Sequence, residues 1–138
     1  MAELYRLQNR YEQAEPLFLQ ALELGLASLG KKHLSIAFDW ARLAQLYRQQ
    51  KKYAKAETFA LKALTLREQT LGPEHPEVGI SLKIVAEVCE ARGQSAEALS
   101  YYRRALPILE TTIPLRPETQ TVRAALERLH HNPPHPTQ

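Results

Sequence analysis

The residues of this chain that could do acid–base, nucleophilic or metal chemistry are five histidines and one cysteine. Cys89 has no second cysteine with which to form a disulfide or a zinc site. His33 and His75 lie in two loops of matching sequence, and repetition at a connector favours a structural role at a helix end over general-base catalysis. Adventitious metal chelation is the most that we expect of the three remaining histidines, His130, His131 and His135.

Motifs that build catalytic sites are absent from the sequence. There is no GxxxxGK(S/T) phosphate loop, no GxGxxG dinucleotide fingerprint, no HExxH zinc motif and no GxSxG nucleophile elbow. Cys89 takes the place of Tyr5 and Tyr47 in a repeated pattern, which predicts a small buried hydrophobic residue rather than a reactive thiol. We therefore predict a protein that is not an enzyme, that needs no cofactor and that holds no metal ion.

Composition places the chain among ordinary globular proteins. Apolar residues make up 44% of its 138 residues and charged residues 24%, and the formal net charge is +3. The first residues lack the apolar core of a signal peptide, and no uncharged run approaches the ~18 residues that a membrane span requires. We expect a cytoplasmic protein with no membrane partner, one helical domain at residues 1–131 and a disordered Pro-rich tail at 132–138.

A repeat of 42 residues organises most of the sequence. Ala2-Glu3-Leu4-Tyr5 recurs as Ala44-Gln45-Leu46-Tyr47 and, in weaker form, as Ala86-Glu87-Val88-Cys89. Repeats of this length indicate stacked supersecondary units that share one continuous core. We predict three units, at about residues 2–43, 44–85 and 86–129.

The spacing inside each unit is helical, because apolar residues recur at steps of three and four and no stretch alternates at period two. Gly72 followed by Pro73 predicts a helix end. Pro76 and Pro117 suit the first turn of a helix, since the N–H that proline lacks would have no partner there. The predicted helices cover a short stub at 2–8 and then residues 11–29, 34–50, 53–71, 76–92, 95–113 and 117–131.

Two prolines fall inside these predicted helices. Pro16 lies within the first turn or so of helix 11–29, where a proline costs little. Pro107 lies in the middle of helix 95–113, where it removes the hydrogen bond to the carbonyl of Arg103. We predict a bend between Arg103 and Pro107.

Three segments of the middle unit carry a recognisable pattern: Leu43-Ala44-Gln45-Leu46-Tyr47, Tyr53-Ala54-Lys55-Ala56-Glu57 and Leu71-Gly72-Pro73-Glu74-His75-Pro76. They resemble the tetratricopeptide repeat in its long, kinesin-light-chain-like form, and the resemblance covers about residues 2 to 129. It implies an all-α fold, a right-handed α-solenoid of antiparallel helix pairs. It also implies a scaffold without catalysis, whose first helices line a concave surface that binds a peptide or partner protein.

The family pattern, carried over residue by residue, implies partner-binding positions along the concave face. The charges at these positions are mixed in sign, and Arg48 with Lys83 could attract an acidic peptide; solvated helix faces are the alternative reading. The implied positions are Arg6, Arg42, Gln45, Arg48, Gln49, Lys83, Glu87 and Glu90.

Two other functions stay open on the sequence alone. One is a structural or self-assembly fragment of a longer array, whose end-to-end association as a homo-oligomer would use the face around Leu4, Leu7, Leu17 and Phe18. The other is a nucleic-acid adaptor, because residues 31–67 hold nine basic and two acidic side chains. The lysine pairs at 31–32 and 51–52 are roughly 25 Å apart along one predicted helix and form no single patch, so the sequence disfavours nucleic acid.

Overall fold

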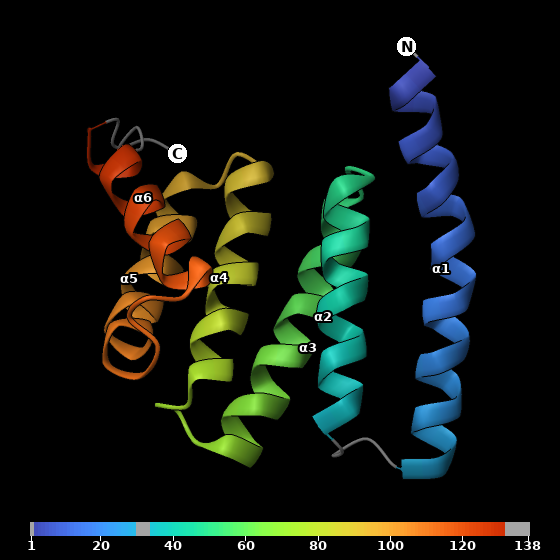
Figure 1. Ribbon diagram of the computed structural model, residues 1–138, viewed down its shortest axis with the longest axis horizontal. Helices are drawn as coiled ribbons and strands as arrows, with labels where there is room; N and C mark the ends of the chain where they lie inside the picture. The colour runs from blue at the N-terminus through green and yellow to red at the C-terminus, as the bar shows by residue number, and fades with distance from the viewer. Residues whose placement is uncertain (1, 30–33, 132–138) are drawn as a thin grey trace.

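The computed structural model describes the backbone of residues 2–29 and 34–131 and the side chains of residues 10–27 and 34–130. Six α-helices and no strand occur in these ranges. Figure 1 shows the row of helices running from α1 at one edge to α5 and α6 at the other. The predicted tail at 132–138 lies outside the described residues. The helices are α1 (Ala2–Leu29), α2 (Leu34–Gln49), α3 (Tyr53–Leu71), α4 (Pro76–Ala91), α5 (Ser95–Thr112) and α6 (Pro117–His131).

The 42-residue offset of the sequence reappears in the helices. Residues 34–49 of α2 map onto residues 76–91 of α4, and residues 53–70 of α3 map onto residues 95–112 of α5. Along the chain, α2 packs against α3 and α4 against α5, while α3 and α5 also contact the next helices, α4 and α6. The buried apolar side chains of these helices form one continuous core. Stacking of neighbouring units therefore supplies the core that a single helix pair could not build.

Helix ends follow the turn residues in the sequence. Helices α4 and α6 begin at Pro76 and Pro117, as predicted. Helix α3 ends before Gly72, which has a φ of 90° and whose N–H donates to the carbonyl of Glu68. A residue with a side chain would be strained at that left-handed φ, so glycine suits this helix end.

The first helix differs from the prediction. The pattern predicts a separate stub at 2–8, but residues 2–29 form one continuous helix, so that prediction is wrong. The equivalent turns in the later units pass through Lys51 at φ 64° and Gly93 at φ 87°. Their counterpart, Asn9, stays helical because among the described helices α1 contacts only α2, and no hairpin contact offsets the cost of breaking the helix.

The same continuity corrects the place of Pro16. Pro16 lies in the interior of α1, not in its first turn, and leaves the carbonyl of Glu12 without its helical donor. Pro107 lies inside α5, as predicted. The bend between Arg103 and Pro107 stays a prediction.

Two residues with potential chemistry have structural roles. The Nδ1 atom of His75 accepts a hydrogen bond from the backbone N–H of Glu77 at 3.1 Å, which caps α4. His33 lies outside the described residues. Cys89 is buried in the core, and this burial raises the pKa of its thiol from 9.0 to about 11, with Glu57 and Glu97 adding to the effect.

The raised pKa of the Cys89 thiol predicts that the folded protein loses stability at alkaline pH. Since its pKa is higher in the folded state, its contribution to stability is present below pH 9 and is lost as the pH rises through 11. We expect the free energy of unfolding, measured by urea denaturation, to fall over this range, and to fall less steeply in Cys89→Ala. Equal slopes for the two proteins would contradict the effect.

Candidate functional site

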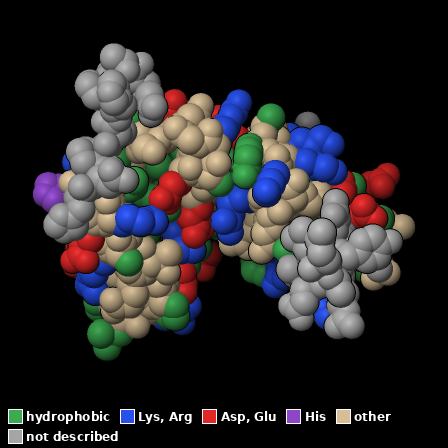
Figure 2. Space-filling view, turned by 90° about the horizontal axis from the view of Figure 1, so that it is seen from above, with side chains coloured by type: hydrophobic (Ala, Val, Ile, Leu, Met, Phe, Trp, Pro, Cys, Tyr) green, Lys and Arg blue, Asp and Glu red, His purple; other side chains and the backbone are tan. Residues whose placement is uncertain are grey.

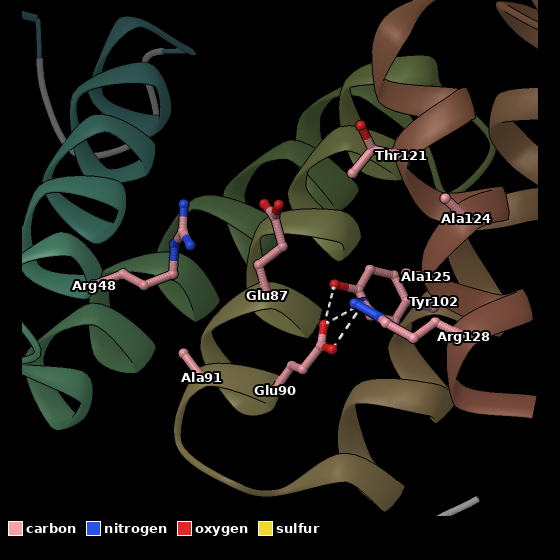
Figure 3. A pocket seen from close by; sticks show the side chains of 9 residues that line it. All are labelled: Arg48, Glu87, Glu90, Ala91, Tyr102, Thr121, Ala124, Ala125 and Arg128. Atoms are coloured by element: carbon pink, nitrogen blue, oxygen red, sulfur yellow. Dashed lines mark hydrogen bonds and ion pairs between the residues drawn. The ribbon is translucent and has the colours of Figure 1, made fainter. Parts of the chain in front are cut away.

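A cavity of about 560 Å³ opens where α2, α4 and α6 stand next to one another. Helix α4 contacts both α2 and α6, so these three first helices form one face of the molecule. Figure 2 shows a hollow between two lobes, with acidic side chains along one wall and basic side chains along the other. Figure 3 shows the lining residues, which are Arg48, Glu87, Glu90, Ala91, Tyr102, Thr121, Ala124, Ala125 and Arg128.

Glu90 joins three helices at the floor of this cavity. Its carboxylate accepts a hydrogen bond from the Tyr102 hydroxyl at 3.0 Å and lies 2.8 Å from Nη2 of Arg128 (Figure 3). Burial of Tyr102, together with the neighbouring negative charge of Glu90, raises the pKa of the phenol. Glu90 is therefore already paired and ties α4 to α5 and α6.

The second carboxylate of the cavity is paired as well. Oε1 of Glu87 lies 3.2 Å from Nζ of Lys83, one turn earlier on α4, and both side chains are mostly buried. Lys83 does not line the cavity itself. The acidic wall is thus neutralised from within the protein.

Arg48 is the charged residue of the cavity that has no such partner. Its Nε is buried and has no hydrogen-bond acceptor, and no ion pair joins its guanidinium to another described residue. In Figure 3 the Arg48 and Glu87 side chains both extend into the space between α2 and α4, with no bond drawn between them. The Nε–H and a terminal N–H of a guanidinium point along one edge, which suits the two oxygens of a carboxylate.

The other predicted positions are not gathered at this cavity. Arg42 is exposed and lies over the ring of Phe38, with 4.7 Å from Cζ to the ring centroid. Gln45 is half-buried and Gln49 is exposed, and neither lines the cavity. The side chain of Arg6 lies outside the described residues.

Sequence reasoning missed the lining residues that come from α5 and α6. The offset that maps α4 onto α6 could have pointed to a first-helix face there, and so to Thr121 and Arg128. No sequence signal marks Tyr102, because it lies on a second helix and reaches the cavity through its hydrogen bond to Glu90.

Three lysines of the middle unit, Lys52, Lys55 and Lys62, lie over aromatic rings of the protein itself. Lys62 Nζ lies 5.7 Å from the ring centroids of both Trp40 and Phe59. Lys52 and Lys55 lie over the ring of Tyr47 in the same manner. Contacts within the protein therefore account for the placement of these three lysines.

The described part of the chain contains no group of three or more histidine, cysteine, aspartate or glutamate side chains arranged to hold a metal ion. None of its helices is both long enough and apolar enough to cross a membrane.

Helix pairs that recur every 42 residues and share one core define an all-α repeat solenoid, a class that presents extended binding surfaces. The family model described as tetratricopeptide repeat matches residues 1–69 and 38–111. The chain belongs to the tetratricopeptide repeat family. Repeats of this family typically mediate protein–protein interaction, and its kinesin-light-chain-like members are generally non-enzymatic scaffolds.

Two solved structures share the fold. One holds nearly identical tetratricopeptide-like repeats attributed to a kinesin light chain of Podosopora anserina: the TM-score is 0.79 at 22% identity, over 94% of this chain and 62% of that one. The other is BtubC (BKLC) from P. vanneervenii, with a TM-score of 0.73 at 19% identity, over 98% of this chain and 63% of that one. The chain thus spans less than two thirds of either structure. No curated protein matches it in sequence.

Proposed function

We propose that this protein is a non-enzymatic, cytoplasmic scaffold that binds an extended segment of a partner protein in the cavity between α2, α4 and α6. The partner places an acidic side chain against Arg48. The binding domain spans residues 1–131, with repeat units at about 2–43, 44–85 and 86–129. The observation that carries this function is the Arg48 guanidinium, which lines the cavity and forms no ion pair with any described residue.

The charge arrangement of the cavity supports an acidic partner. Glu87 and Glu90 are paired with Lys83 and Arg128, so a bound carboxylate would meet neutralised acids and one unpaired cation, Arg48. The Arg48 guanidinium extends into the cavity, where it can donate to a bound carboxylate, and a hydrogen bond to a charged group contributes about 1.5–3 kcal/mol. Arg48 therefore favours Asp or Glu in the partner over their amides.

The shape of the cavity supports an extended segment. Three alanines line it, Ala91, Ala124 and Ala125, and their small side chains leave room for a polypeptide backbone. The hydroxyl of Thr121 on α6 can donate to or accept from that backbone.

Peptide selection tests this function. A library of random ten-residue peptides displayed on phage would be selected against the 138-residue chain, and the enriched peptides would be measured against Arg48→Gln. We expect an Asp or Glu at one shared position, and binding at least roughly tenfold weaker in the variant, because a charge-assisted hydrogen bond is lost.

Arg42→Gln is the matched control, since Arg42 lies on the same helix, is exposed and does not line the cavity. We expect it to leave peptide affinity unchanged. Enriched peptides without a shared acid, or equal affinity for the wild type and Arg48→Gln, would refute the proposal that the cavity binds an acidic segment.

A further inference from the structure

Helix α1 carries an apolar surface that the described helices leave largely uncovered. We define the outer α1 face by Ala14, Leu17, Ala21 and Leu24, which follow one another at steps of three, four and three. Ala14 is half-buried at the border with the core, whereas the other three residues are exposed. Leu17 is 67% exposed and Leu24 is 68% exposed. Among the described helices α1 contacts only α2, and Figure 1 shows it at the edge of the row.

The equivalent faces of α3 and α5 are covered. Leu66 and Ile108, which correspond to Leu24 in the repeat, are only 6% and 8% exposed. The alanines that correspond to Ala14 and Ala21 are fully buried in both helices. The full equivalent sets are Ala56, Phe59, Ala63 and Leu66 in α3, and Ala98, Tyr101, Ala105 and Ile108 in α5.

The helix that covers the α3 face has the same pattern as the face itself. Tyr47 of α2 stacks on Phe59 of α3, with ring centroids 5.7 Å apart, which shows how these two faces meet. The face of α2 reads Ala37, Trp40, Ala44 and Tyr47, again small, large, small and large at steps of three, four and three. The outer α1 face therefore resembles both partners of the α2–α3 pair, so it is complementary to itself.

The charges beside the outer α1 face permit such self-pairing. Gln13 and Gln20, which flank the face on its exposed side, are neutral. Two antiparallel copies of the face would thus bring no like charges together along its length.

Packing of the outer α1 face against α6 of another copy is less favourable than packing against a second α1. The residues of α6 that correspond to Ala37, Trp40 and Ala44 are Thr121, Ala124 and Arg128, all of them exposed. They offer neither a large apolar side chain nor a neutral surface to Leu17 and Leu24. End-to-end growth through α1 and α6 is consequently disfavoured.

We propose that the outer α1 face binds the same face of a second copy of this chain, with the two α1 helices antiparallel about a two-fold axis. Leu17 of each copy packs near Leu24 of the other, and Ala21 lies near the axis. Leu17 belongs to the association face predicted from the sequence, whereas Phe18 is half-buried below Arg42 and does not take part. This dimer does not depend on peptide binding in the cavity between α2, α4 and α6.

Sedimentation equilibrium of the 138-residue chain tests the dimer. We expect the mass to rise from 15.7 kDa toward twice that value with increasing concentration. The double variant Leu17→Glu, Leu24→Glu should stay monomeric with unchanged helical circular dichroism. Leu115→Glu, at a residue that is 88% exposed and outside α1, should dimerise like the wild type.

Disulfide formation tests the antiparallel arrangement. Ala21→Cys adds one exposed thiol near the axis, while the native Cys89 is buried, so mild oxidation should link two copies. Glu23→Cys, exposed on the other side of α1, is the matched control and should not link. A monomer at every concentration, or equal linking of the two variants, would overturn the proposal. The proposal would also be overturned by a monomer that binds a synthetic peptide of residues 34–49, the sequence of α2. That result would show that the outer α1 face binds the first helix of a repeat unit and not a second α1.

Discussion

Replacing Leu109 with alanine is expected to lower the free energy of unfolding by about 2–5 kcal/mol. Leu109 is fully buried on α5 and packs against Gly79 of α4, where an added Cβ would lie 2.7 Å from Leu109 Cδ2 and 2.9 Å from Cγ. The glycine lets the two helices approach closely, and truncation of the leucine would leave a cavity at that crossing. Urea denaturation followed by circular dichroism measures the change.

The matched control for this prediction is Leu115→Ala. Leu115 is 88% exposed, so its truncation should change stability by no more than about 0.5 kcal/mol. An effect of Leu109→Ala as small as that of the control would show that the α4–α5 crossing is not tightly packed.

The same contact predicts coupling between Leu109 and Gly79. Gly79→Ala alone should destabilise by about 1–3 kcal/mol, because its methyl group would collide with Leu109. In Leu109→Ala that methyl group would enter vacated space, so the double variant should be more stable than the sum of the single effects predicts. Simple additivity would contradict the contact.

Removing Arg67 should have the second large effect. Arg67 is buried on α3, where its Nη1 donates to Ser81 Oγ at 2.7 Å and its Nη2 lies 3.6 Å from Glu77 Oε2. Burial lowers the pKa of the guanidinium, and the Glu77 carboxylate opposes that shift. We expect Arg67→Ala to cost about 2–4 kcal/mol, because it removes a packed aliphatic stem and leaves the buried Ser81 hydroxyl without a partner.

A double replacement separates packing from polar pairing at Arg67. Arg67→Met combined with Ser81→Ala keeps an apolar side chain of similar length and removes both polar groups, so its stability should lie within about 1 kcal/mol of the wild type. Arg104→Met is the surface control, since Arg104 is exposed and lies 3.9 Å from Glu68; it should cost less than about 1 kcal/mol. A double variant as unstable as Arg67→Ala would mean that the polar contacts themselves hold α3 to α4.

The positions of the helices follow largely from local signals. Pro76, Pro117 and Gly72 mark helix ends through backbone constraints that act within a few residues, and the structure has those ends. The break predicted before Tyr11 failed because a turn also needs a returning helix, and Asn9 alone does not end a helix. Local signals could not report that missing contact.

The candidate site was likewise predictable only in part from the sequence. The repeat offset and the family resemblance bring Arg48, Glu87 and Glu90 onto first helices, and all three line the cavity. That Glu90 is already paired with Tyr102 and Arg128, from two later helices, was beyond the reach of a pattern within one unit.

By itself the sequence determined the class of fold, the helices after α1 and the family, because helix periodicity and a repeated offset are properties of neighbouring and equally spaced residues. Tertiary structure alone decided which charges are paired inside the protein, as those of Glu87 and Glu90 are, and which lack such a partner among the described residues, as that of Arg48 does. Residues 67 and 109 illustrate this: they are equivalent in the repeat, yet one is a buried arginine bonded to Ser81 and the other a leucine against Gly79. Such differences depend on the side chains that the neighbouring helix presents, so equal spacing along the chain cannot specify them.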